Sequence, residues 1–147
     1  MIDTPDPHLK TKVLGIDYGD KKIGLAIGIN GIVEPLKILE NRPDHLLEKE
    51  VLKEIIGISQ REKVQTIVIG LPLLNGKETP SSKKIRNFSE KLNLMLPEDL
   101  EIKYVDESRT SKDSLEKAIE AGIPRKKRKD DHALAACEIL KRFFVGS

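Results

Sequence analysis

Two acidic residues of this sequence directly follow short apolar segments. Asp17 closes the run 12–17, and Glu107 comes just after the run 102–105. Functional sites of open α/β sheets form beyond the carboxyl ends of the strands. If both runs are parallel neighbours in one sheet, the two carboxylates converge at one end of that sheet. The structural alternatives are a turn residue for Asp17 and a helix cap for Glu107.

A further polar group stands where the last helical pattern begins, at Asp131 and His132. Carboxylates that meet at one point repel one another unless a cation lies between them, and carboxylates with an occasional imidazole suit Mg²⁺ or Mn²⁺. Two such ions activate water and stabilise the leaving oxygen of a phosphodiester. The pattern therefore predicts metal-assisted phosphodiester hydrolysis, with four candidate catalytic residues and metal ligands: Asp17, Glu107, Asp131 and His132. The alternatives are that Asp131 only favours the helix dipole and that His132 is structural.

A basic run precedes this polar group, at residues 125–129. Its first four residues are Arg125, Lys126, Lys127 and Arg128. Such a run binds phosphate groups by releasing their counterions, which makes it a candidate nucleic-acid-binding segment. The alternative is a solvated loop.

The apolar patterns between these residues predict five strands and four helices. The predicted strands are 12–17, 22–28, 32–39, 64–70 and 102–105. The predicted helices are 43–60, 81–96, 110–121 and 131–144. Asn30 and Gly31 predict a tight hairpin between the second and third strands, and residues 71–80 predict a loop. This order predicts an α/β fold, with a mixed five-stranded sheet and helices on both faces.

The length of 147 residues suits one domain, and we expect a flexible tail at 1–11 followed by a single domain at 12–147. Hydrophobic residues make up 38% and charged residues 34%, and no apolar run reaches the ~18 residues that cross a membrane. No secretory pattern opens the chain, and its single cysteine excludes a disulfide framework and a Cys-based zinc site. We therefore expect a cytoplasmic protein with no membrane partner, in which Cys137 is a core residue.

Four segments occur in the order of the motifs of a known family, and each resembles one of those motifs. The segments are 13–27, 69–73 together with 75–76, 105–111 and 131–140. Collectively they resemble the YqgF/RuvX family. The resemblance implies an RNase H-like fold, a nuclease similar to Holliday junction resolvases, and 5′-end processing of pre-16S rRNA in ribosome biogenesis.

The resemblance also implies site residues. Asp17 and Glu107 match the first two acidic positions of the family, which would hold Mg²⁺ or Mn²⁺. The basic pair after the first strand, the loop after the fourth and the segment after the fifth match positions suited to contacting a nucleic-acid backbone. The residues concerned are Lys21, Lys22, Pro72, Asn75, Arg109 and Thr110.

The sequence departs from the family pattern at two places. Arg109 is displaced by one residue from the family's arginine. An ungapped alignment of the last helix puts His132, not Asp131, at the third acidic position. On a helical wheel His132 lies on the face that packs on the sheet, while Asp131 lies nearer the polar face. Either His132 is the third ligand, or a distorted helix start lets Asp131 reach the site.

Three functions remain open at this point. The first is a metal-dependent nuclease acting on structured RNA or on branched DNA such as a Holliday junction. The second is a non-catalytic nucleic-acid-binding assembly factor, which the two departures favour. The third is an ATP-binding module, since residues 15–19 resemble a phosphate loop of actin-like proteins and sugar kinases, although that fold needs a second such domain. The sequence is compatible with a monomer or a homodimer.

Overall fold

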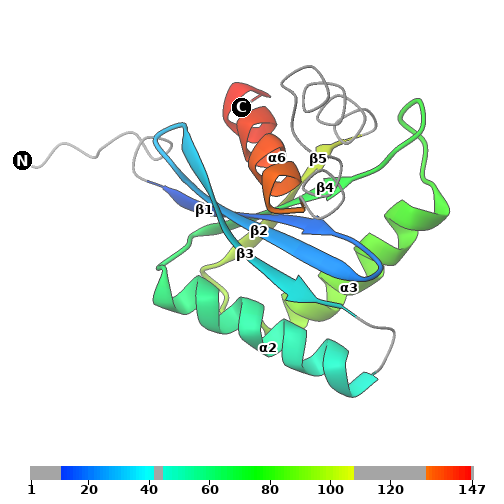
Figure 1. The fold of residues 1–147 in the computed structure, drawn as a ribbon, viewed down its shortest axis with the longest axis horizontal. Helices are drawn as coiled ribbons and strands as arrows, with labels where there is room; N and C mark the ends of the chain where they lie inside the picture. Colours follow the sequence, from blue (N-terminus) through cyan, green and yellow to red (C-terminus); the bar gives the residue numbers. More distant parts are fainter. Residues whose placement is uncertain (1–10, 42–44, 108–131, 147) are drawn as a thin grey trace, which may run out of the picture.

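The computed structural model describes residues 11–41, 45–107 and 132–146 (Figure 1). The strands are β1 (Lys12–Tyr18), β2 (Lys22–Ile29), β3 (Ile32–Glu40), β4 (Thr66–Leu71) and β5 (Glu101–Asp106). The helices are α2 (His45–Arg61), α3 (Pro80–Met95) and α6 (His132–Gly146). Each matches a predicted element to within one or two residues at either end. The predicted helix at 110–121, the basic run at 125–129 and residues 1–10 of the expected tail lie outside the described residues.

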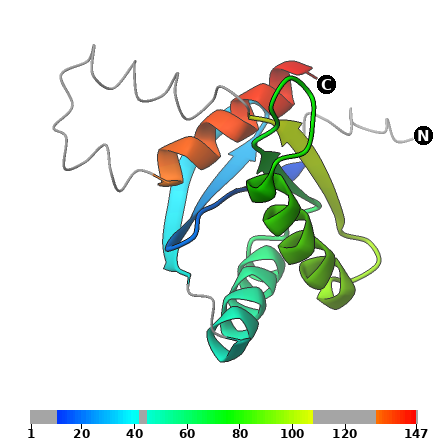
Figure 2. The same cartoon turned by 90° about the vertical axis from the view of Figure 1, so that its right-hand side faces the viewer.

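The strands form one mixed sheet in the order β3-β2-β1-β4-β5. β2 pairs antiparallel with both β1 and β3, whereas β4 pairs parallel with both β1 and β5. The carboxyl ends of β1, β4 and β5 therefore lie along one edge of the sheet. α2 and α3 cover one face of the sheet and α6 covers the other (Figures 1 and 2). The predicted fold class is confirmed, including the parallel neighbours that bring Asp17 and Glu107 to the same end.

The sheet face under α2 and α3 is built from large aliphatic side chains. Its fully buried strand residues include Leu14, Ile16, Ile23, Leu25, Ile67 and Ile69. Ile55 of α2 and Leu92 of α3 pack against them. Full burial of each such side chain stabilises the fold by about 1.5–3 kcal/mol, so this face holds the larger part of the core.

The opposite face carries small residues where α6 crosses it. A Cβ atom added at Gly24 of β2 would lie 2.1 Å from the backbone carbonyl carbon of His132, and one at Gly15 of β1 would lie 2.6 Å from Leu140 Cγ. The helix therefore lies directly on the backbone of the sheet. The smaller core on this side consists of Val13, Ala26, Val68, Ala136, Cys137, Ile139 and Leu140. Cys137 is buried there, as predicted.

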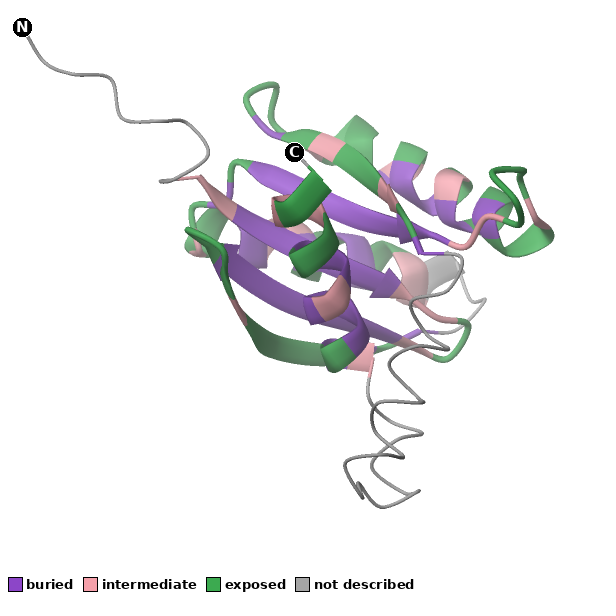
Figure 3. Ribbon diagram, turned by 90° about the horizontal axis from the view of Figure 1, so that it is seen from above, coloured by how far each residue is buried: buried purple, intermediate pink, exposed green. Residues whose placement is uncertain are grey.

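β2 and β3 are joined by the predicted tight turn. Asn30 and Gly31 have φ angles of 55° and 81°, the left-handed values that a type I′ hairpin turn requires. β3 is an edge strand that contains Pro35, and its register with β2 shifts between Leu25 and Ala26. Figure 3 shows this strand largely exposed beside the buried inner strands.

Within the described part of the chain, the helices lack the length and apolar character that crossing a bilayer requires.

Candidate active site at the carboxyl ends of β1 and β5

A cleft of about 230 Å³ opens at the sheet edge where β1 and β5 end. Its lining residues are Asp17, Tyr18, Gly19, Asp20, Pro72, Ser81, Lys84, Ile85, Glu107 and His132. Three of the four predicted catalytic residues therefore meet at one cleft. The fourth, Asp131, lies outside the described residues.

Asp17 and His132 are in direct contact. His132 Nδ1 lies 2.9 Å from Asp17 Oδ2, and because a carboxylate oxygen accepts, the ring nitrogen donates this hydrogen bond. Asp17 is buried, and His132 is the first residue of α6. Glycines permit the approach, since a Cβ atom at Gly19 would lie 2.8 Å from His132 Cε1. The docking of α6 on the sheet thus brings the imidazole to the end of β1.

Glu107 is the second buried carboxyl group of the cleft, with 6% of its surface exposed. Its backbone N–H donates to the carbonyl oxygen of Leu71 over 2.9 Å, which fixes Glu107 beside the end of β4. Gly70 leaves room for the side chain, because a Cβ atom there would lie 2.6 Å from Glu107 Cδ. Glu107 Oε2 is buried and has no hydrogen-bond partner among the described residues.

The pKa of Glu107 is raised to about 8. Burial is the main cause, because it penalises the charged form. The negative charge of Asp17 raises the pKa further, while the positive charge of Arg142 opposes the rise. Two buried carboxyl groups that repel each other, one with an unpartnered oxygen, are an arrangement that a divalent cation would relieve.

The donor types of this cleft fit a hard divalent cation. Two carboxyl groups and an imidazole are ligands that Mg²⁺ and Mn²⁺ accept. In the described ranges, however, no three His, Cys, Asp or Glu side chains are grouped closely enough to surround one ion. Within these ranges the cleft therefore supplies only part of a coordination shell for such an ion.

Asn41 positions the turn between β1 and β2, and sequence patterns did not reveal it. Its side-chain Nδ2 donates to the carbonyl oxygen of Gly19 over 2.8 Å, and its backbone N–H donates to the carbonyl oxygen of Lys21 over 2.8 Å. Asn41 is 5% exposed. Because this turn contributes Gly19 and Asp20 to the cleft lining, Asn41 fixes one wall of the cleft.

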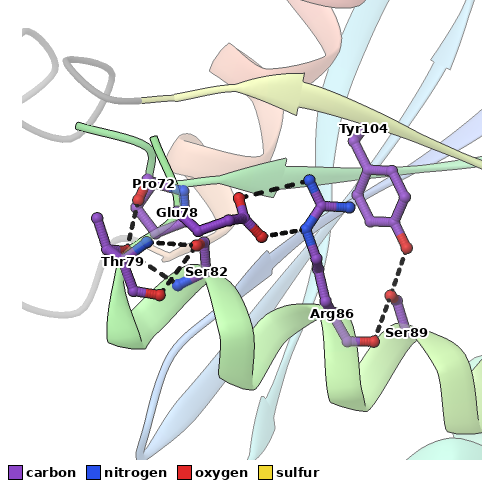
Figure 4. Close-up of polar contacts among 7 residues, drawn as sticks. All are labelled: Pro72, Glu78, Thr79, Ser82, Arg86, Ser89 and Tyr104. Atoms are coloured by element: carbon purple, nitrogen blue, oxygen red, sulfur yellow. Dashed lines mark hydrogen bonds and ion pairs between the residues drawn. The ribbon is translucent and has the colours of Figure 1, made fainter. Parts of the chain in front are cut away.

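Pro72, in the loop between β4 and α3, lines the cleft together with Ser81, Lys84 and Ile85 of α3. Figure 4 shows the contacts that join this loop to the start of α3. Thr79 caps α3: its backbone N–H donates to Ser82 Oγ over 2.8 Å, and its hydroxyl accepts from the Ser82 backbone N–H over 3.1 Å. The Thr79 hydroxyl also donates to the carbonyl oxygen of Pro72 over 2.8 Å. Pro72 lines the cleft, whereas Asn75 lies in a turn next to Gly76 and is not among the lining residues.

Arg86 of α3 contacts both this loop and β5 (Figure 4). The Arg86 guanidinium forms an ion pair with Glu78 and lies 5.1 Å from the centre of the Tyr104 ring. The hydrogen bond that Arg86 donates to the Glu78 carboxylate raises the pKa of Arg86 above its ordinary value. The Tyr104 hydroxyl forms a hydrogen bond with Ser89 of α3. These contacts hold the first turns of α3 in place beside the cleft.

Several predicted nucleic-acid-binding residues are not tested by this geometry. Lys21 is exposed in the turn after β1, Lys22 is the half-buried first residue of β2, and neither lines the cleft. Six others lie outside the described residues, namely Arg109, Thr110, Arg125, Lys126, Lys127 and Arg128.

Residues 11–145 match the family model of RuvX, described as Holliday junction resolvase. The chain is 37% identical over 132 residues to a Maridesulfovibrio salexigens protein named "Putative pre-16S rRNA nuclease", a match that covers 88% of this chain and 93% of the relative. A Porphyromonas gingivalis protein with the same name is 39% identical over 124 residues, covering 81% of this chain and 83% of the relative.

Solved structures share the fold at low sequence identity. Thermus thermophilus RuvC in complex with Holliday junction substrate has a TM-score of 0.58 and 14% identity, over 92% of this chain and 94% of that one. The fowlpox virus Holliday junction resolvase has a TM-score of 0.53 and 14% identity, over 93% and 100%. These neighbours confirm the RNase H-like fold that the resemblance implied. With the family model matched over nearly the whole chain and relatives above 30% identity, this chain belongs to the RuvX family of nucleases.

Proposed function

We propose that this protein is a metal-dependent endonuclease that hydrolyses phosphodiester bonds in structured RNA, with the 5′ end of pre-16S rRNA as its substrate. The observation that carries the proposal is the convergence of Asp17, Glu107 and His132 at one cleft. The names of the curated relatives support the substrate.

We assign the following roles to the residues of the cleft. Asp17 and Glu107 would hold Mg²⁺ or Mn²⁺, and Asp131 or His132 would complete the site. Through its 2.9 Å contact, His132 also orients the Asp17 carboxylate. A bound divalent cation supplies Lewis-acid stabilisation of the charge that develops on the phosphate. Lys21, Lys22 and the 125–129 run would bind phosphates of the nucleic-acid backbone.

A branched DNA substrate is the second candidate. The description of the family model and the RuvC complex with a Holliday junction favour it. Symmetric cutting of a four-way junction needs two active sites, so this function would require a homodimer, whereas cleavage of an RNA leader suits a monomer. For either substrate we propose a cytoplasmic location.

The test is cleavage of two labelled substrates, a pre-16S 5′-leader RNA and a four-way DNA junction, with Mg²⁺, Mn²⁺ or EDTA. We expect the wild type to cut the RNA with metal and not with EDTA, and we expect Asp17→Asn to abolish cutting. Asp99→Asn, an exposed acid before β5, is the control and should cut like the wild type. Asp131→Asn and His132→Ala then identify the third ligand, because its loss raises the metal concentration needed for cutting.

Binding without cutting by the wild type, under every metal condition, would support the assembly-factor alternative instead. In that case Asp17→Asn should bind both substrates as tightly as the wild type. Cutting of the junction alone would assign the protein to branched DNA.

A further inference from the structure

Lys84 lies across the cleft from the residues to which we assign catalysis. It belongs to α3, whereas Asp17 lies near the end of β1 and Glu107 directly follows β5. Among the described residues that line the cleft, it alone carries a fixed positive charge. A polyanionic backbone that approaches buried carboxyl groups needs a cation on the opposite side, because the acids repel it.

The ammonium group of Lys84 can change its ion-pair partner at little cost in folding stability. Its Nζ lies 3.6 Å from Oδ1 of Asp20, in the turn after β1. Both side chains are exposed, 66% for Lys84 and 80% for Asp20. An exposed ion pair of this length contributes little to stability, so a phosphate can replace the Asp20 carboxylate without loss to the fold.

The helix backbone that carries Lys84 is also held firmly in place. The next residue, Ile85, is 3% exposed within the larger core. The start of α3 is held by the capping interactions of Thr79 with Ser82 and by the bond from Thr79 to Pro72 (Figure 4). The base of the lysine side chain is therefore fixed relative to the sheet edge, while its exposed ammonium group lies beside Asp20, another residue of the cleft lining.

We propose that Lys84 binds a backbone phosphate of the nucleic acid across the cleft from Asp17 and Glu107, and that Asp20 holds this lysine until the phosphate displaces it. The proposal deepens the proposed function and rests on it, since it assumes that nucleic acid enters this cleft. In this proposal Lys84 positions the nucleic-acid strand, and Asp20 competes with the backbone phosphate for the lysine.

The test measures binding of a fluorescently labelled structured RNA by anisotropy in EDTA, over a series of salt concentrations. Loss of one phosphate contact reduces the slope of log K against log salt by about one. We expect this reduction for Lys84→Gln and restoration of the slope by Lys84→Arg. Lys83→Gln is the matched control, because it removes the same charge from the neighbouring α3 residue, which does not line the cleft. Equal reductions for Lys83→Gln and Lys84→Gln would overturn the proposal.

A double-mutant cycle tests the role of Asp20. Asp20→Asn should tighten RNA binding by about two- to fivefold, the size of one exposed charge interaction. It should have no such effect in the Lys84→Gln background, because there is no lysine to release. The same tightening in both backgrounds would overturn the competition between Asp20 and phosphate. Failure of the proposed function would appear separately, as a wild type that binds RNA but does not cut it with Mg²⁺ or Mn²⁺.

Discussion

At the scale of single residues, Glu107 combines burial with a neighbouring negative charge. Its folded-state pKa of about 8 lies well above the ordinary value of 4.5. In this interval the native protein keeps a proton that the unfolded chain has already released. Folding therefore favours the protonated carboxyl group, and the free energy of unfolding depends on pH through this residue.

We predict that metal-free protein loses stability as pH rises from about 4.5 to about 8, because the unfolded chain releases the Glu107 proton that the native protein keeps. The contribution of this one group is at most about 1.4 kcal/mol per pH unit. Glu107→Gln removes this titrating group, so the free energy of unfolding of the variant, relative to that of the wild type, should increase with pH. The measurement is urea denaturation in EDTA at several pH values. A difference between the two proteins that stays constant with pH would contradict the prediction.

The sequence indicated those site residues that stand beside a recognisable pattern. Asp17 and Glu107 follow apolar runs, and His132 opens a helical pattern, so their convergence could be predicted. Asn41 and Lys84 were not found, since their roles depend on contacts with the turn after β1, which lies far from both in the chain. No local sequence pattern indicates a contact between residues so far apart in the chain.

At the scale of elements, the placement of α6 depends on the glycine residues beneath it. Gly15, Gly24, Gly28 and Gly70 each face an atom of α6 or of Glu107 at a distance that leaves no room for a methyl group. The sequence predicted α6 and every described strand from hydrophobic periodicity. It did not predict how closely α6 approaches the sheet, because periodicity marks an element as buried without giving the size of its partner's side chains.

We predict that Gly24→Ala destabilises the protein by about 1–3 kcal/mol, the usual cost of overpacking, because the new methyl group overlaps the first residue of α6. The variant should also cut less well, since α6 carries His132. Gly57→Ala is the control: Gly57 lies within α2 with nothing within 4 Å of the added carbon. That change should stabilise the protein by about 0.5–1 kcal/mol. Thermal denaturation of the two variants measures both effects, and a neutral Gly24→Ala would contradict the packing described here.

At the scale of the whole molecule, two cores share one sheet. The larger core lies under α2 and α3, and the smaller one lies under α6. The strands β1, β2 and β4 contribute side chains to both, so neither core can persist once the sheet is lost. This arrangement favours a single cooperative unfolding transition.

We predict that probes on the two faces report the same urea midpoint. Tyr18 packs against Phe88 of α3 with ring centres 4.7 Å apart, and it reports on the larger core. Cys137 is the single cysteine of the chain and is 5% exposed in the smaller core, so its reaction with a thiol reagent reports on α6. Tyrosine emission and thiol labelling across a urea series provide the comparison. Labelling of Cys137 at lower urea than the loss of tyrosine signal would show that α6 detaches first.

The outer strand β3 also determines how copies of this protein can assemble. Pro35 has no N–H group to offer to an added strand, and the shifted register beside it interrupts a regular hydrogen-bond ladder. Edge-to-edge growth of the sheet, from a ten-stranded dimer to an open fibril, is therefore blocked along this strand although it exposes Ile32, Leu36 and Ile38. A homodimer that cuts both arms of a branched substrate would therefore not form by pairing its β3 strands.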